Sequence, residues 1–513
     1  MLIRRMLEET ASRRPDQPAL ISAAASITYR QLADQVSRLA AGMINLDLAA
    51  GDRVAILLPN TIDFVTALLA ANHAGLIAVP LFADYPPLEQ HEILADTAAR
   101  LLITSPDLLP SVPSAALQPL INVILTRGEA RGYLTFETLM ATGMLDEAEP
   151  AGMDRDPIGI IVHTSGSTGR PKGVAHTQSR LARRADLLIN TLSLTADDRA
   201  LTAQHLGRPV FLVADLLAMI KTGGSLTLVD PPETELFWRL YARTSPTYLV
   251  APTGYIDQLI HSPGAAQADH SRLRFWINAG DLPTEELQQR VARITGRPLR
   301  NMYGLTEGGF LSITTPNAPI KRGSIGKPMA GVEMRLVDKD GRDVAPGEMG
   351  HLHIRTPNMM VGYWNDTLLT HRAMGSGWLE TPDLFRIDED GDYRFLGRDS
   401  EIIVRTGANV ASARVIESML LHPAIAEAVL VGVPDPREGQ VPIAFYRLHA
   451  GASDPGSDRL HAWVAVRVDA WSIPEDFFLL DHWPMTRHGK IDRTTLIAMA
   501  AVRTSRNRDV QTP

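Results

Sequence analysis

Residues 160–174 read IIVHTSGSTGRPKGV and join a run of apolar residues to a loop of glycine, serine and threonine. In such a loop the glycines let the backbone approach a ligand closely, while N–H groups and hydroxyls can donate hydrogen bonds to phosphate oxygens. Lys172 adds a positive charge. The pattern differs from a Walker A loop, because Gly173 rather than Ser or Thr follows the lysine. The spacing therefore predicts a polyphosphate-binding loop, but not that of a P-loop phosphoryl transferase.

Further segments carry polar residues in short patterns that follow this loop along the chain. They read NMYGLTE at 301–307, GWLETPD at 377–383, Gly397–Arg398, TGANV at 406–410 and PMTRHGKIDR at 484–493. Together with the loop they resemble the motifs of the adenylate-forming superfamily, which includes acyl- and aryl-CoA ligases, adenylation domains of nonribosomal peptide synthetases and firefly luciferase. The resemblance extends from about residue 8 to about residue 500. It implies that a carboxylic acid reacts with Mg·ATP to give acyl-AMP and pyrophosphate, and that a thiol then takes the acyl group.

The resemblance also implies where ATP and AMP bind. Tyr303 would stack on adenine, Asp383 would accept hydrogen bonds from both ribose hydroxyls, and Thr306 would contact the α-phosphate. Glu307 would hold Mg²⁺. The complete set of expected nucleotide-binding residues is Thr164, Ser165, Gly166, Ser167, Thr168, Gly169, Lys172, Gly280, Asp281, Asn301, Met302, Tyr303, Gly304, Thr306, Asp383 and Arg398.

Lys490 is the catalytic cation that the resemblance implies, acting with Thr306 and Glu307. Attack of a carboxylate on the α-phosphate brings two anions together, and an ammonium group between them offsets the repulsion. The family rotates its small C-terminal domain between the two half-reactions, about a hinge that corresponds to Ser400 here. The chain has no cysteine, so the acceptor thiol has to come from a substrate. CoA is the expected acceptor, and the phosphopantetheine of a separate carrier protein is the alternative.

The acid is expected to bind beneath the phosphate loop. The candidate lining residues are His205, Arg208, Val210, Gly304 and Gly309. Amino-acid-activating relatives usually have an aspartate at about the position of Val210, so an aryl or acyl acid is expected rather than a standard α-amino acid. Asp215 is the alternative position for that aspartate. Either His205 or Arg208 could be the gate of the pocket, and Arg208 would suit an additional acidic or polar substituent.

The elements that must position these residues alternate between strand and helix. Apolar runs at 53–58 and 77–81 enclose a helical pattern at 63–74, as in a parallel sheet. From about Gly323, turns rich in Gly and Asp separate shorter strands, which predicts an antiparallel, β-barrel-like subdomain. The predicted fold is α/β, with a large N-terminal domain at 1–398, a hinge at 399–400 and a small mobile α+β domain at 401–513 that carries Lys490.

Composition limits the remaining possibilities. The chain has 513 residues, of which 45% are hydrophobic, and a net charge of −8. This is globular composition with material for a large core, and the acidic balance argues against nucleic-acid binding. Neither a secretory signal nor a membrane span is found in the sequence, so we expect a cytoplasmic protein. The expected oligomeric state is a monomer or homodimer. A non-catalytic acyl- or nucleotide-binding relative is a further alternative, against which the intact motifs weigh.

Overall fold

The structure is a computed structural model. It describes residues 2–120, 122–128, 132–142, 155–165, 171–314, 321, 323–398, 403–406, 408–410, 412–435, 437–485 and 491–509. Among these residues, none of the helices has the length and apolar character needed to cross a membrane.

The first of two eight-stranded sheets contains the phosphate-loop strands. Its order is β19-β9-β8-β4-β3-β5-β6-β7. The strands from β8 to β7 run parallel, whereas β9 and β19 are antiparallel additions at one edge. Their bounds are β3 Arg53–Leu57, β4 Ile77–Leu81, β5 Leu101–Thr104, β6 Asn122–Leu125, β7 Leu134–Thr135, β8 Ile158–Ser165, β9 Pro171–Thr177 and β19 Gly362–Tyr363.

The second sheet has the order β15-β14-β13-β12-β10-β11-β1-β2. It is parallel except at its two ends, where β15 and β2 run antiparallel to their neighbours. Its strands are β1 Pro18–Ile21, β2 Ser26–Thr28, β10 Arg199–Thr202, β11 Ser225–Leu228, β12 Tyr248–Ala251, β13 Phe275–Asn278, β14 Leu299–Leu305 and β15 Gly309–Ile313.

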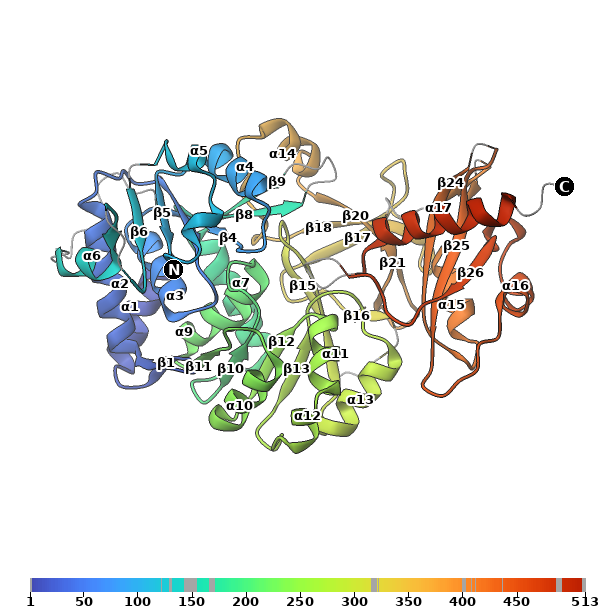
Figure 1. The fold of residues 1–513 in the computed structure, drawn as a ribbon, viewed down its shortest axis with the longest axis horizontal. Coiled ribbons are helices and arrows are strands. Elements are labelled where there is room, and N and C mark those ends of the chain that lie inside the picture. The colour runs from blue at the N-terminus through green and yellow to red at the C-terminus, as the bar shows by residue number, and fades with distance from the viewer. Residues whose placement is uncertain are drawn as a thin grey trace.

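Helices fill the space between the two sheets and cover their outer faces (Figure 1). The largest apolar core lies between the sheets. It is formed with α1 Ile3–Arg13, α2 Tyr29–Ile44, α3 Ile62–His73, α7 Gln178–Leu192, α8 Pro209–Phe211, the π-helix Leu212–Leu217 and α9 Ala218–Thr222. Smaller cores lie outside. The outer helices are α4 Pro87–Thr97, α5 Ser114–Leu117, α10 Thr234–Thr244, α11 Thr253–His261, α12 Pro263–Gln267 and α13 Glu285–Thr295. Helix α6 Phe136–Thr142 packs against α2 and adds Phe136 and Leu139 to the largest core. The parallel strands therefore have apolar neighbours on both faces, which explains their uninterrupted apolar sequences.

A third sheet is antiparallel and follows the second in the chain. Its order is β16-β21-β20-β18-β17, and α14 Thr367–Met374 packs against β20. The strands are β16 Ser324–Gly326, β17 Glu333–Val337, β18 Met349–Arg355, β20 Leu379–Ile387 and β21 Tyr393–Arg398.

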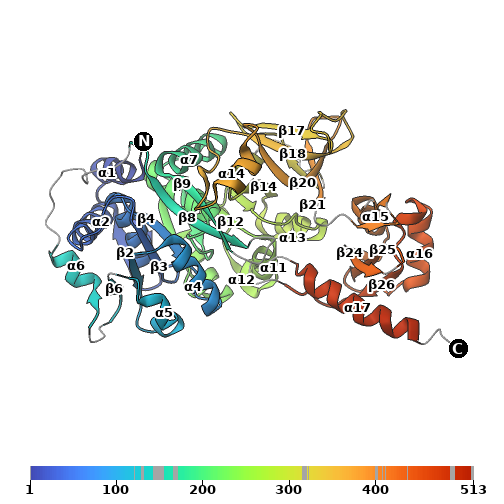
Figure 2. The same ribbon diagram turned by 90° about the horizontal axis from the view of Figure 1, so that it is seen from above.

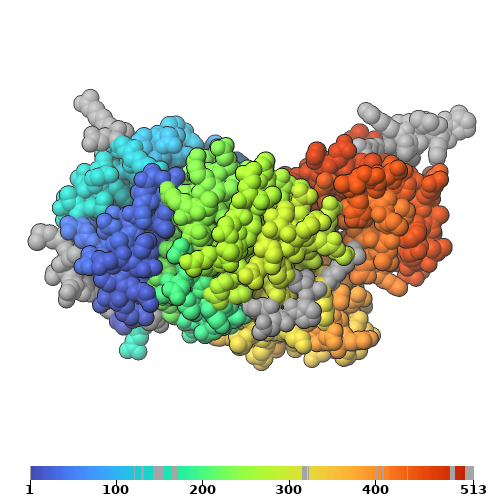
Figure 3. All heavy atoms as spheres, turned by 90° about the horizontal axis from the view of Figure 1, so that it is seen from below, coloured from blue at the N-terminus to red at the C-terminus, as the bar shows by residue number. Residues whose placement is uncertain are grey.

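The C-terminal part forms a compact α+β unit with its own cores. It lies at one end of the molecule, opposite the N-terminal helices (Figures 2 and 3). Its elements are β22 Val404–Arg405, β23 Ala408–Asn409, α15 Ser412–Leu420, β24 Ile425–Asp435, β25 Gly439–Leu448, α16 Ser457–Ala465, β26 Asp476–Leu479 and α17 Arg493–Asp509. The predicted α/β class is confirmed, whereas the predicted hinge at 399–400, with Ser400, lies outside the described residues. The division of the chain at this point stays a prediction.

Candidate active site

The phosphate loop joins two paired strands. Thr164 on β8 lies opposite Lys172 on β9, so the two strands that flank the loop pair as a β-hairpin. Strand β8 also pairs in parallel with β4, which fixes the hairpin to the first sheet. Gly166, Ser167, Thr168, Gly169 and the side chain of Ser165 lie outside the described residues, as does Lys490.

A second hairpin carries the YGLTE motif. Strands β14 and β15 pair antiparallel, and Thr306 and Glu307 lie in the turn between them. A side chain at Gly304 would place its Cβ 2.4 Å from the Gly309 carbonyl oxygen. At Gly309, where φ is +80°, a Cβ would lie 2.5 Å from Nε of Arg184. Packing therefore requires both glycines, and their predicted part in the acid pocket stays a prediction.

Asp383 is the centre of a buried polar cluster that links three predicted site residues. Its side chain is only 1% exposed. The Tyr303 hydroxyl donates to Oδ2 at 2.5 Å, and Arg398 Nε donates to Oδ1 at 2.9 Å. The pairing of Asp383 with Arg398 across β20 and β21 fixes the second contact. Burial and the Asp383 charge raise the pKa of Tyr303 well above its ordinary value, so its hydroxyl remains a donor. The Tyr303 ring packs edge-on against Phe385.

The predicted adenine side of the site is built at the ends of β13 and β14. Asn278 Nδ2 donates to the Asp281 carbonyl oxygen at 2.9 Å and to Asn301 Oδ1 at 3.4 Å. Asn301 Nδ2 donates in turn to the Ser324 carbonyl oxygen at 3.2 Å. Gly280 and Asp281 are exposed, whereas Met302 is buried. Sequence reasoning missed Asn278, although a polar residue at the end of a buried strand was a usable signal.

The candidate gate residues lie in a loop between β10 and α8. His205 Nε2 donates to the Leu58 carbonyl oxygen at 2.9 Å, and Nδ1 accepts from the Gly207 N–H at 3.0 Å. The ring also packs edge-on against Phe64 and Phe82. His205 is thus held as a structural residue in this conformation. The Arg208 guanidinium lies 5.6 Å from the centre of the Phe82 ring, and Val210 packs against the large core.

His205 makes the stability of the fold depend on pH. Burial lowers the pKa of His205 from 6.5 to about 4. Between these pH values the unfolded chain binds a proton at this ring that the native state does not bind, so the free energy of unfolding falls as the pH falls. We expect His205→Gln to remove about 3 kcal/mol of this pH dependence. Urea unfolding of both proteins from pH 7 to pH 4 measures it, and parallel curves for the two proteins would contradict the assignment.

Glu307 is the candidate metal ligand. Its carboxylate oxygen Oε1 accepts a hydrogen bond from the Tyr363 hydroxyl at 3.0 Å. Within the described ranges there is no cluster of three or more His, Cys, Asp or Glu residues that could hold a metal by itself. Mg²⁺ commonly binds through one or two carboxylates together with substrate phosphates and water. A single carboxylate beside a phosphate-binding hairpin therefore fits an ion that arrives with ATP.

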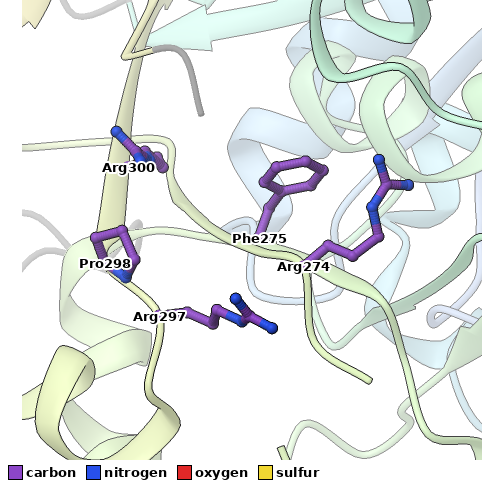
Figure 4. A pocket seen from close by; sticks show the side chains of 5 residues that line it. All are labelled: Arg274, Phe275, Arg297, Pro298 and Arg300. Carbon is purple, nitrogen blue, oxygen red and sulfur yellow. The ribbon is translucent and has the colours of Figure 1, made fainter. Parts of the chain in front are cut away.

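Three arginines surround a hollow away from these residues (Figure 4). The hollow has a volume of about 270 Å³ and is lined by Arg274, Phe275, Arg297, Pro298 and Arg300. Arg274 donates to both carboxylate oxygens of Asp198 at 2.6 Å. The hollow lies at the amino ends of β13 and β14, whereas open parallel sheets bind ligands beyond the carboxyl ends of their strands. It is therefore separate from the candidate active site.

Comparison with known proteins identifies the family to which this chain belongs. A model of the family of AMP-binding enzymes matches residues 7–364, and a model of the C-terminal domain of these enzymes matches residues 416–490. The chain belongs to the AMP-binding enzyme family. The AMP-forming acid–thiol ligase predicted from the motifs is thereby confirmed at the level of the family.

The similarity between this AMP-binding enzyme and individual relatives extends over almost its full length. Oxalate–CoA ligase from Arabidopsis thaliana is 30% identical, covering 95% of this chain and 96% of the relative. Feruloyl-CoA synthase from an Amycolatopsis species is also 30% identical, over 93% of this chain and 94% of the relative. A crystal structure of an anthranilate CoA ligase in complex with anthranoyl-AMP has a TM-score of 0.87, with 25% identity and 98% coverage of both chains.

Proposed function

We propose that this protein is an ATP-dependent carboxylate–CoA ligase for an aryl or acyl acid. In the first half-reaction a carboxylate oxygen attacks the α-phosphorus of ATP, the bond to the β-phosphate oxygen breaks and pyrophosphate leaves. In the second, the sulfur of CoA attacks the acyl carbon and AMP leaves. The named activities of the oxalate and feruloyl relatives support CoA as the acceptor.

The observation that carries the proposal is the pattern of hydrogen bonds to the Asp383 carboxylate. A carboxylate has about four acceptor positions on its two oxygens. Tyr303 and Arg398 occupy one on each oxygen. The remaining acceptor positions suit the two hydroxyls of a ribose, and the same Tyr303 offers a ring for adenine. Fixed donors around a carboxylate also reduce the cost of ordering it when the nucleotide binds.

The remaining roles follow from charge. Thr306 would donate to the α-phosphate, and Lys172 would contact the outer phosphates from β9. Glu307 would hold Mg²⁺, which neutralises phosphate charge when bound. Lys490 would place its ammonium group between the carboxylate and the α-phosphate. The protein thus brings two anions together with fixed cations and donors.

Carboxylate-dependent pyrophosphate release tests the proposal. A panel of aryl, short, medium and long acyl acids, including acids with a second acidic group, would be assayed with and without CoA. We expect at least one acid to give release that CoA accelerates, with acyl-CoA accumulating. Release that stops near one equivalent per enzyme despite CoA would instead favour a carrier-protein acceptor. The absence of release with every acid would contradict the proposal.

A further inference from the structure

Two arginines of helix α7 hold the backbone of a distant segment. This segment, residues 358–363, is called the bridging segment here because it connects two parts of the candidate site. Arg184, which is 2% exposed, donates to the Asn358 carbonyl oxygen from Nε at 3.0 Å and from Nη2 at 2.7 Å. Arg180 Nη1 donates to the carbonyl oxygens of Met359 at 2.7 Å and Met360 at 2.6 Å. Three consecutive carbonyl groups are therefore fixed by one face of the helix.

The bridging segment is bound on one side to the phosphate hairpin. The Val361 N–H donates to the Ala175 carbonyl oxygen at 2.8 Å, and β19 continues the pairing with Tyr363 opposite Val174. Just beyond it, the Trp364 N–H donates to the Gly173 carbonyl oxygen at 2.7 Å. The segment is therefore fixed against the strand that carries Lys172.

On its other side the bridging segment is bound to Glu307 in two places. The Met360 N–H donates to the Glu307 carbonyl oxygen at 2.6 Å, which fixes the main chain of the turn. The Tyr363 hydroxyl donates to Oε1 of the same residue at 3.0 Å, which fixes the side chain. In the part of the chain that the structure describes, this hydroxyl is the one group that donates a hydrogen bond to the Glu307 carboxylate.

Two charged neighbours act on the buried Arg184 in opposite directions. Arg184 has no carboxylate within ion-pair distance among the described residues. The positive charge of Arg180 repels it, and the smaller attraction of the Glu307 charge acts against that repulsion. Burial lowers the pKa of Arg184 to about 9, so the guanidinium remains charged at neutral pH. A buried charge without a direct partner is costly to a fold. Its hydrogen bonds to the bridging segment and its attraction to Glu307 offset that cost.

We infer that Tyr363 is a positioning residue for Glu307. Its hydroxyl holds Oε1, so that Oε2 would be the oxygen available to Mg²⁺, while Arg180 and Arg184 keep the bridging segment in register with the phosphate hairpin. This inference rests on the proposed role of Glu307 toward Mg²⁺. Neither Tyr363 nor the two arginines belong to the set of site residues predicted from the sequence.

The test is the binding of ATP, measured by titration calorimetry in the absence of any carboxylic acid. Each protein would be titrated once with ATP in excess Mg²⁺ and once with ATP in EDTA. For Tyr363→Phe we expect the Kd of Mg·ATP to rise about five- to tenfold, with the Kd of metal-free ATP unchanged. This is less than the full effect of losing a hydrogen bond to a charged group, because Tyr363 contacts Glu307 and not the nucleotide. Arg180→Lys, which keeps the charge but loses the double contact, should raise the Kd of Mg·ATP in the same direction.

The control is Tyr446→Phe, which removes a hydroxyl that donates to Asp454 Oδ1 at 2.6 Å in the C-terminal unit. It should leave both Kd values unchanged. Wild-type affinity of Tyr363→Phe for Mg·ATP would overturn the inference, and so would an equal loss for both forms of ATP, because that indicates a merely structural role. Glu307→Gln tests the proposed role of Glu307 separately from that of Tyr363. If Glu307→Gln binds Mg·ATP and metal-free ATP with the wild-type Kd values, the proposed role of Glu307 fails.

Discussion

Lys490→Ala is expected to slow acyl-adenylate formation by about 100- to 1,000-fold, the usual loss when one group that stabilises developing charge is removed. The physical reason is that the carboxylate and the α-phosphate repel each other, and this ammonium group would lie between them. The second half-reaction involves attack by CoA sulfur on an acyl carbon and needs no such cation at that place. Pyrophosphate release with the preferred acid measures the first step, and thioester formation from synthetic acyl-AMP measures the second.

The matched control for this variant is Lys339→Ala, which removes an exposed lysine in the turn between β17 and β18. Both half-reactions should proceed in it at the wild-type rate. If Lys490→Ala reduces both half-reactions equally, the lysine acts through the fold of the C-terminal unit rather than on the α-phosphate.

Asp383→Ala is expected to raise the Kd of ATP on the order of 100-fold, because two hydrogen bonds from ribose hydroxyls to a charged acceptor would be lost. The substitution also leaves the Tyr303 hydroxyl and the Arg398 Nε–H without their common acceptor. We therefore expect an accompanying loss of about 1–3 kcal/mol in the free energy of unfolding. Calorimetric titration with ATP gives the first quantity and urea unfolding the second.

Two further variants separate these effects. Tyr303→Phe breaks the internal hydrogen bond but keeps the carboxylate, so it shows how much of the loss in affinity comes from a less ordered Asp383. Asp390→Ala removes an exposed carboxylate from the turn between β20 and β21, where it pairs with Lys321 at 2.5 Å, and should not change ATP binding. Unchanged affinity in Asp383→Ala would refute the assignment of the ribose site.

The strands of the first sheet were predictable because burial on both faces leaves an unbroken apolar run. The predictions at 53–58 and 77–81 agree with β3 and β4 to within one residue. Strand β9 was not predictable in this way, since it begins with Pro171, Lys172 and Gly173, which have low strand propensity. Its conformation comes from neighbours on both sides, β8 and β19, and a local pattern carries no information about the second of these.

The candidate site was predictable as a set of residue types but not as a network. The motifs placed Tyr303, Asp383 and Arg398 at one ligand, and the structure adds that they bond to each other. The contact between Tyr363 and Glu307 was missed, because it depends on how a distant segment packs against α7. His205 was predicted as a gate candidate from its position, whereas its two backbone hydrogen bonds follow from the fold of the loop.

The pairing of β19 with β9 also has a consequence for the chain as it leaves the ribosome. All other strands of the first sheet have been synthesised by residue 177, but β19 lies at 362–363. At a synthesis rate of about 5–20 residues per second, β9 waits roughly 10–40 s for this neighbour. During that time its unpaired N–H and C=O groups form an open sheet edge, which is the kind of surface on which chains aggregate. A short strand from far along the sequence thus covers the middle of an edge that the earlier part of the chain leaves open.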